Sequence, residues 1–235
     1  MEPPRPSTSC RAFSLVEILV TVSIIGILAA LLFPAVKNMR NQSKKIASLS
    51  NLRVIGSGLA AFAADNGGGF PASCSSTYAA PFWTDSLAPY LPDPVMVTKA
   101  NTSLKFKISP ALVDPLVAAN RHHVLGDYGA NSDLFYGPTG WPITSTPVTM
   151  QSLSGRLSKV VAVMTAEDVT LNPPTGSWFV SRKDVVNQSP GSWSNSRPSD
   201  RGLGVYLCLF ADLHTEAIEK KDFLERRAEL MTANP

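Results

Sequence analysis

The feature that most constrains this chain is an apolar run at residues 15–33, in which Glu17 is the only charged residue. Folded as a helix, these 19 residues would be about 28 Å long, close to the ~30 Å hydrocarbon core of a bilayer. A carboxylate costs about 2.5–3.5 kcal/mol at the centre of such a helix and less near its end. A cation from a neighbouring molecule offsets this cost, so the run predicts a membrane helix that assembles with others.

A secretory signal peptide is the alternative, since it also combines basic residues with an apolar segment. The apolar segment of a signal peptide is usually about 7–15 residues long, shorter than residues 15–33, and here Glu17 interrupts it. We therefore interpret the run as a transmembrane helix.

Seven residues around the start of the run form a motif: Arg11, Ala12, Phe13, Ser14, Leu15, Val16 and Glu17. This motif resembles the prepilin processing and methylation site of type IV pilins and type II secretion pseudopilins. Ala12 stands where the family usually has Gly, and Pro34 lies at the usual distance from Phe13. The resemblance implies a leader of residues 1–12, cleavage between Ala12 and Phe13 by a prepilin peptidase, and methylation of the Phe13 amine. The remaining recognition residues would be Arg11, Ser14, Leu15 and Val16.

The resemblance also assigns an assembly role to Glu17, Gly26 and Pro34 in a transmembrane helix of residues 13–36. Glu17 would pair with the Phe13 amine of an adjacent subunit in a medium of low dielectric constant. Gly26 either permits close approach of a second helix or is a tolerated small residue. Pro34 lacks a backbone donor, so it is expected to kink or loosen the helix at the membrane edge.

By this resemblance, the chain is a structural subunit, a pseudopilin, of a type II secretion pseudopilus or a type IV pilus-like filament. Its expected partners are other pilins or pseudopilins, the prepilin peptidase, an inner-membrane assembly platform and the lipid bilayer. Basic residues lie on both sides of the apolar run, so charge does not set its orientation. The resemblance implies a single-pass anchor in the inner membrane, with the leader in the cytoplasm and the C-terminal head in the periplasm.

The apolar pattern continues beyond the membrane-length run as a stripe with spacings of three and four. Its members are Ile46, Leu49, Leu52, Ile55, Leu59 and Phe62. The glycines at 67–69 then end the helix. We expect one helix over residues 13–65, whose amphipathic second half, 37–65, packs on a globular head of residues 66–235.

The head is loop-rich and combines short strands with short helices. Strands are expected at 105–108, 159–164, 178–180, 204–211 and 215–218, helices at 82–91 and 220–231, and a turn at 127–131. Several strands that follow one long helix favour an α+β fold, in which an antiparallel sheet with long loops packs on that helix.

Two head segments resemble the pseudopilin-like branch with a C-terminal H-x9-DG element that is abundant in Planctomycetes and Verrucomicrobia. They are Tyr-Gly-Ala-Asn at 128–131 and Leu-Phe-Ala-Asp-Leu-His at 209–214. Leu213 stands where the branch has Gly, and Gly202 stands where it has His. Ser109, before a proline, replaces the Cys of a Cys-Pro element of the branch.

Composition and motifs favour neither nucleic-acid binding nor catalysis. The net charge is +3, and loss of a leader with two arginines and one glutamate would leave +2, too weak to argue for a nucleic-acid partner. The sequence has no P-loop, no Gly-x-Ser-x-Gly and no His–Cys signature, so we predict that the chain is not an enzyme. His122 and His123 would point opposite ways on a strand, which makes them a poor ligand pair, and a surface loop is expected.

Asp212, His214 and Glu216 alternate, so on a strand they would share one face. Two carboxylates and a histidine suit Zn²⁺, whereas the alternative is a solvated turn at the end of a strand. We favour the turn, so no metal or other cofactor is expected there. Some pseudopilins bind a structural Ca²⁺ in a head loop, but no such loop is identified in this sequence.

Cys74 and Cys208 would remain after loss of the leader, which carries Cys10. In an oxidising compartment the two either form a disulfide or stay as buried thiols.

The second interpretation of the chain is a membrane-anchored extracytoplasmic binding domain, with carbohydrate as one candidate ligand. Trp83, Trp141, Trp178 and Trp193 would either stack on a ligand or fill small cores under the loops. Residues 187–201, rich in Ser, Pro, Gly and Arg, would either reach a ligand or form a disordered loop.

Overall fold

The computed structural model describes residues 15–76, 79–99, 104–135, 148–170, 172–187 and 196–233, and every structural statement below concerns these residues. They form two compact units, one ending at Ser43 and one beginning at Lys44. The boundary falls inside helix α1, Leu15–Asp65, which contributes to both units. Arg11, Ala12, Phe13 and Ser14, which carry the expected processing site, lie outside the described residues.

Helix α1 confirms the expectation of a long N-terminal helix, and it continues through Pro34 without interruption. The kink expected at Pro34 stays a prediction. The helix is followed by Gly67 and Gly68, which have positive φ angles of 63° and 80°. The backbone N–H of Gly68 donates to the carbonyl of Ala63 (2.7 Å), a closure typical of helices that end at glycine.

One face of α1 is buried in the head from Ser48 onward. The buried members of the predicted stripe are Leu52, Ile55 and Leu59, and Leu49 and Phe62 are half-buried. The prediction is wrong for Ile46, which fits the spacing of the stripe but is 64% exposed. Ser48 is the first residue of α1 described as buried, and its Oγ lies 2.9 Å from the hydroxyl of Tyr128.

The main sheet of the head has the strand order β11-β10-β6-β5-β8, and β7 and β9 also pair with β6. Its strands are β5 (Tyr128–Asn131), β6 (Val161–Asp168), β7 (Thr175–Gly176), β8 (Phe179–Val180), β9 (Ser196–Pro198), β10 (Val205–Phe210) and β11 (Thr215–Glu219). The strand pairs are antiparallel except β5 with β8, which is parallel. Antiparallel ribbons also join β1 (Cys74–Ser76) to β2 (Ala79–Phe82) and β3 (Val95–Thr98) to β4 (Lys105–Ile108).

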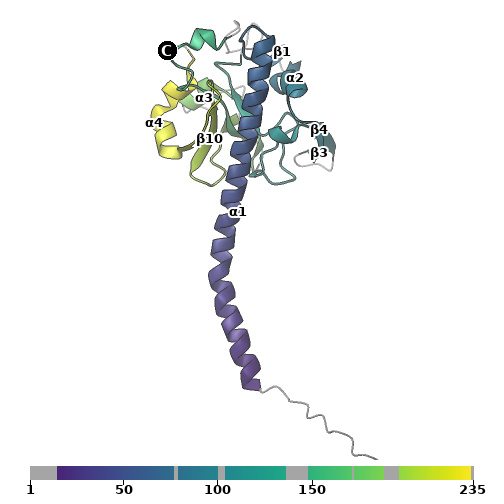
Figure 1. Cartoon of the computed structure of the whole chain (residues 1–235), viewed down its shortest axis with the longest axis vertical. Coiled ribbons are helices and arrows are strands. Elements are labelled where there is room, and N and C mark those ends of the chain that lie inside the picture. The colour runs from purple at the N-terminus through teal and green to yellow at the C-terminus, as the bar shows by residue number, and fades with distance from the viewer. Residues whose placement is uncertain are drawn as a thin grey trace, which may run out of the picture. The chain divides into compact units, whose positions relative to one another are not determined.

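Short helices surround this sheet. They are α2 (Trp83–Leu87), α3 (Arg182–Asn187) and α4 (Lys220–Met231), with 3₁₀ turns at Ala88–Tyr90, Pro110–Leu112 and Gln151–Leu153. Figure 1 shows α3 and α4 next to β10. The head therefore contains the short strands and short helices that its sequence predicts.

The two faces of the sheet carry separate apolar cores, because side chains alternate along a strand. Leu209 of β10 lies in the core that contains Leu52 of α1. Cys208 and Phe210 of the same strand lie in the other core, with Phe223 of α4. The head thus has three layers, with α1 on one face of the sheet and α3 and α4 on the other (Figure 1).

The structure confirms an α+β fold with a long N-terminal helix and a mostly antiparallel sheet. The predicted strands at 105–108, 159–164, 178–180, 204–211 and 215–218 are confirmed as β4, β6, β8, β10 and β11. The predicted helices at 82–91 and 220–231 are confirmed as α2 with its following 3₁₀ turn and as α4.

The turn predicted at 127–131 is wrong, because residues 128–131 form β5, a buried strand inside the main sheet. Gly129 explains the difference. A Cβ at Gly129 would lie 2.5 Å from Val180 Cγ2 and 2.7 Å from Ala166 Cβ. The small residues that suggested a turn instead let the neighbouring strands approach closely.

Cys74 and Cys208 are free thiols, and both are buried. Burial raises the pKa of the Cys208 thiol, so this thiol stays protonated and unreactive. The sequence left open a disulfide or two buried thiols, and the structure shows two buried thiols.

Candidate functional site

Bulky apolar side chains cover α1 between Leu15 and Phe33 on every face. They are exposed throughout, from 50% at Val20 to 81% at Leu15. Successive residues of a helix point about 100° apart, so this exposure leaves no polar face for water. By length and composition α1 can cross a membrane, and none of its apolar window is buried against the rest of the described chain. This segment is therefore suited to lipid or to other apolar helices.

The hydroxyl groups in this segment are satisfied within the helix. Thr21 Oγ1 donates to the carbonyl of Ile18 (2.9 Å), and Ser23 Oγ donates to the carbonyl of Leu19 (2.7 Å). Such bonds remove the cost of an unpaired hydroxyl in hydrocarbon. Thr21 and Ser23 are thus compatible with a membrane-spanning helix.

Glu17 lies in the first turn of the described helix and is exposed. A carboxylate is favourable at that end, because the backbone dipoles of a helix place partial positive charge there. Leu15 and Val16 precede it and are also exposed. At Gly26, an added Cβ would meet no atom of the described chain within 4 Å, so the helix surface is open at that point. The surface of α1 at Gly26 is therefore not covered by the described part of the chain.

The Tyr-Gly-Ala-Asn segment forms β5 and joins the C-terminal helix to the sheet. Asn131 Nδ2 donates to the carbonyl of Val161 (2.8 Å) and to that of Met231 at the end of α4 (3.3 Å). Close by, the backbone N–H of Ala233 donates to Asp133 Oδ2 (3.1 Å). The segment that resembles the pseudopilin-like branch therefore has a packing role.

Asp212, Leu213 and His214 form the turn between β10 and β11. His214 Nδ1 lies 2.5 Å from Asp212 Oδ1, whereas His214 Nε2 lies 3.9 Å from Glu216 Oε2. The imidazole stacks on the ring of Phe210, with centroids 4.2 Å apart. Within the described residues, no group of three His, Cys, Asp or Glu side chains is placed to hold a metal ion.

Leu213 has a φ of 72°, in the left-handed region that favours glycine. This is the position at which the branch pattern has Gly. The leucine side chain is half-buried against the core that contains α1. Packing of the Leu213 side chain offsets part of the backbone strain at this position.

A buried polar cluster links α1 to the loops of the head. We define the polar cluster as Ser48, Asp114, His122, Asp127, Tyr128 and Arg201. At its centre, Asp127 Oδ2 accepts from the backbone N–H of Asp114 (3.0 Å) and lies 2.6 Å from His122 Nδ1. Asp127 Oδ1 accepts from the backbone N–H of His123 (3.0 Å). Gly176 makes room for this carboxylate, since a Cβ there would lie 1.8 Å from Asp127 Oδ1.

Arg201 provides the positive charge of the polar cluster. Its Nε donates to Asp114 Oδ2 (3.3 Å), and its Nη2 donates to the carbonyl oxygens of Ala166 (2.5 Å) and Asp127 (3.3 Å). The side chains of Asp114 and Asp127 are fully buried. Burial raises the pKa of the Asp114 carboxyl, and the Arg201 guanidinium acts in the opposite direction. The cluster thus holds buried charges in place through bonds within the chain.

Tyr128 and His123 show the same effect of burial on their ionisation. Burial raises the pKa of the Tyr128 hydroxyl well above its usual value, so it stays neutral beside Ser48. Burial lowers the pKa of His123, whose Nδ1 accepts from the backbone N–H of Leu125 (3.1 Å). Both groups therefore remain uncharged in the folded head at neutral pH.

The expectation of a surface loop at 122–123 is wrong for His122, which is buried and bonded to Asp127. The sequence does not reveal the polar cluster, because its members come from segments that are far apart in the chain. The signal that could have identified part of it is the pair His122 and Asp127, a base and an acid five residues apart. That spacing alone does not distinguish a buried pair from a solvated loop.

Trp83 and Trp178 are buried in the core of the head, and Trp83 Nε1 donates to the carbonyl of Trp178 (2.7 Å). The interpretation that they stack on a ligand is therefore wrong for these two residues. Trp141 and Trp193 lie outside the described residues, as do residues 188–195 of the 187–201 segment.

Comparison with known families gives a match at the N-terminus. A family model described as the prokaryotic N-terminal methylation motif matches residues 7–33, which include the proposed processing site and the apolar run. No curated protein and no solved structure matches the chain. Together with the exposed apolar helix, the match supports a pilin-like protein that is processed by a prepilin peptidase and anchored in a membrane by a single helix.

Proposed function

We propose that the chain is a pseudopilin, a structural subunit that assembles through α1 into a type II secretion pseudopilus or a type IV pilus-like filament. The observation that carries this proposal is an apolar helix, exposed on every face, whose first residues belong to a prepilin-type motif. Prepilin peptidase would cut between Ala12 and Phe13, with Arg11, Ser14, Leu15 and Val16 as the other recognition residues. The Phe13 amine would then be methylated.

Assembly follows from the physical properties of residues 13–36. Apolar helices that leave lipid for a bundle of like helices keep their side chains away from water, so extraction costs little hydrophobic free energy. Glu17 would pair with the Phe13 amine of an adjacent subunit. Gly26 would allow a second helix to approach closely, since no atom of the described chain fills the space beside it. Pro34 would loosen the helix at the membrane edge.

In this proposal the chain crosses the inner membrane once and places its head in the periplasm before assembly. Its partners are other pilins or pseudopilins, the prepilin peptidase, an assembly platform in the inner membrane and the bilayer. The subunit acts by packing and needs no cofactor. The bond from Asn131 to the end of α4 and the polar cluster would keep the head rigid while α1 is pulled from lipid.

The test compares Glu17→Gln, which removes the charge and keeps the shape, with Ser23→Ala, a change in the same helix that keeps Glu17. Filaments sheared from cells and the membrane fraction are assayed with an antibody against the head. We expect Glu17→Gln to insert normally in the membrane and to enter filaments at least about tenfold less often, because a buried amine loses its counter-ion. Ser23→Ala should behave as the unaltered chain.

Incorporation of Glu17→Gln at the level of the unaltered chain would contradict the proposal. It would favour a membrane-anchored extracytoplasmic binding domain, which requires neither cleavage nor Glu17. Burial of Trp83 and Trp178 already removes two of the four tryptophans on which a carbohydrate-binding version of that alternative relies.

A further inference from the structure

Positive charge gathers on α1 directly after its apolar run, at Lys37, Arg40, Lys44 and Lys45. Lys37, Arg40 and Lys44 are exposed, and Lys45 is half-buried. Within the helix, spacings of three and four residues place Lys37, Arg40 and Lys44 on one face. We define these three residues as the basic face. The four cations exceed the net charge of +3 of the whole chain, so the rest of the sequence is close to neutral.

The basic face has no acidic partner in the described part of the chain. No Asp or Glu occurs between Glu17 and Asp65. Among the described residues, no ion pair involves a member of the basic face. Copies of α1 that pack side by side would bring like charges together, so a neighbouring α1 supplies no counter-ion in this stretch. The negative charge that neutralises the basic face therefore comes from outside α1.

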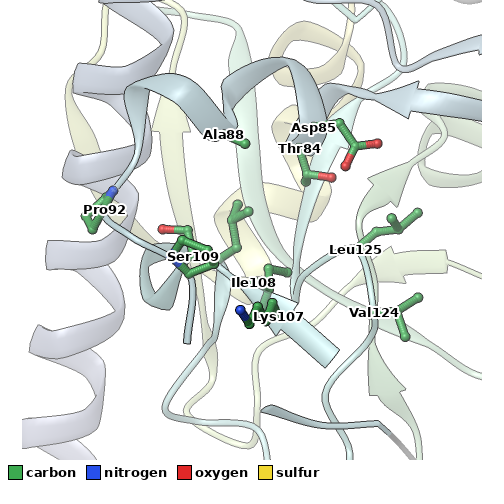
Figure 2. Close-up of a pocket in the computed structure, with 11 residues that line it drawn as sticks. Thr84, Asp85, Ala88, Pro92, Lys107, Ile108, Ser109, Val124 and Leu125 are labelled. Carbon is green, nitrogen blue, oxygen red and sulfur yellow. The ribbon is translucent and has the colours of Figure 1, made fainter. Parts of the chain in front are cut away.

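Two cations of the head show the contrast, because each has an acidic neighbour. Arg197 Nε lies 2.8 Å from Glu167 Oε1 at the surface. Lys107 lines a cavity of about 190 Å³ that Asp85 also lines, and Figure 2 shows this cavity between α2, β4 and the loop before β5. Both places therefore combine positive and negative charge. The basic face differs in kind, since it presents positive charge alone.

The basic face lies near the depth of lipid phosphates when residues 15–33 span the hydrocarbon core. At about 1.5 Å per residue, Lys37, Arg40 and Lys44 lie about 6, 10 and 16 Å beyond Phe33 along the helix. The headgroup layer extends about 5–8 Å beyond the hydrocarbon on each side. Side chains of a helix lean toward its N-terminus, here toward the bilayer, and long basic side chains extend their charge further that way. Lys37 and Arg40 therefore reach the headgroups, and Lys44 lies within about one Debye length of them.

We propose that the basic face binds the headgroups of anionic phospholipids, in the leaflet on the side of the head. A lipid phosphate is the negative group that a bilayer places at this depth, directly beside the apolar run. Each Lys or Arg near an anionic surface favours binding by up to about fivefold, so three of them give a preference over zwitterionic lipid. The inference rests on the membrane anchor of the proposed function, and it is independent of filament assembly.

The first test reconstitutes the full chain in phosphatidylcholine vesicles that contain a trace of spin-labelled phosphatidylglycerol or spin-labelled phosphatidylcholine. Electron paramagnetic resonance measures how much of each labelled lipid the protein immobilises. We expect phosphatidylglycerol to be enriched at the protein, and Lys37→Gln/Arg40→Gln/Lys44→Gln to lower that enrichment by at least about fivefold. The difference isolates the basic face, because the arginines of the leader are present in both chains. Equal enrichment in the two chains would overturn the proposal.

The second test compares two exposed arginines of α1, Arg40 and Arg53. Arg53 lies about 30 Å beyond Phe33 along the helix, well outside the headgroup layer. Arg40→Gln should therefore lower the enrichment of phosphatidylglycerol at least about twofold, whereas Arg53→Gln should leave it unchanged. Equal losses would show that net charge rather than the position of the basic face attracts the lipid, and they would overturn the proposal.

Two further measurements separate the lipid from other sources of negative charge. Inorganic phosphate in molar excess over the labelled lipid should not displace phosphatidylglycerol, and displacement would assign the basic face to soluble phosphate instead. Loss of self-association in the triple variant in pure phosphatidylcholine, with unchanged lipid enrichment, would assign the face to a second copy of the chain. Failure of the chain to insert in vesicles would contradict the membrane anchor itself, whereas insertion without enrichment would contradict only the lipid preference.

Discussion

Soluble proteins usually bury apolar side chains and expose charged ones. Two regions of this molecule depart from that rule in opposite ways: residues 15–33 of α1 and the interior of the head. The first region exposes leucine, isoleucine and valine on every face, from Leu15 to Phe33. The second buries two acidic side chains, Asp114 beside the Arg201 guanidinium and Asp127 beside the His122 imidazole. Apolar side chains lie where a soluble protein would have polar ones, and charges lie where it would have apolar ones.

The difference shows what each region needs to be stable. None of the apolar window of α1 is buried within the described chain, which suits surroundings of lipid or of other apolar helices. The charges of the head are satisfied by bonds within the chain, so the head needs no outside partner to hold them. Substitutions in the two regions should therefore have effects of different kinds.

The largest effect on stability is expected from Arg201→Met. This change leaves the Asp114 side chain buried without its cation, and it should lower the free energy of unfolding by about 3–5 kcal/mol. Arg197→Met is the matched control, because Arg197 is 61% exposed in its pair with Glu167 and should cost about 1 kcal/mol or less. Urea unfolding of the full chain in micelles, followed by near-ultraviolet circular dichroism, measures both. Similar losses in the two variants would mean that the cluster does not depend on its buried cation.

The next largest effect on the free energy of unfolding is expected from a buried leucine of α1, and an exposed leucine of the same helix is its control. Leu52→Ala removes a side chain that is fully buried in the head and should cost about 2–5 kcal/mol. Leu19→Ala removes one that is 62% exposed, and it should change the unfolding of the head by no more than about 0.5 kcal/mol. The same urea experiment applies. A large loss of head stability in Leu19→Ala would show that the two parts of α1 are not energetically distinct.

The smallest effect is a pH dependence at His123. Burial lowers the pKa of His123, against the opposite influence of Asp127 and Asp168, while Lys99 also lowers it. A histidine whose pKa is lower in the folded state contributes its full stability at pH values above the unfolded-state pKa of about 6.5. That contribution is lost as the pH falls through the folded-state pKa. Protonation of Nδ1 would also break its bond from the Leu125 N–H.

We therefore expect the melting temperature to fall from pH 7 to pH 5, and to fall less in His123→Gln. Thermal unfolding at several pH values measures the difference between the two chains. That difference isolates His123, because Asp114 is present in both chains. Burial raises the pKa of Asp114, so its contribution to the pH dependence of stability has the opposite sign. Identical slopes would show that His123 titrates alike in the folded and unfolded states.

The elements that the sequence predicts well are those with a local pattern. β10 and β11 are indicated by an apolar run followed by a turn at 212–213, and α1 is indicated by a repeat of apolar residues and by terminal glycines. Ile46 fits that repeat but is exposed, because where a helix meets its partner depends on the partner. Periodicity identifies the face of a helix, and it does not fix where burial begins.

The features that the sequence does not predict depend on contacts between distant segments. Tyr128 to Asn131 have no strand pattern, and the need for Gly129 is evident only once Val180 and Ala166 are in place. The polar cluster joins Ser48 to Arg201 across most of the head, and each of its charges looks ordinary within its own segment. The candidate processing and recognition residues, in contrast, lie close together in a short motif at 11–17 and can be identified without the fold.

The central claim is that the mature chain begins at Phe13 and that its exposed apolar helix serves assembly. Intact-mass spectrometry of the protein from its native membrane measures this directly. The account predicts a chain that lacks residues 1–12 and carries one added methyl group on the Phe13 amine. A product that retains Met1, in cells with an active prepilin peptidase, would contradict it.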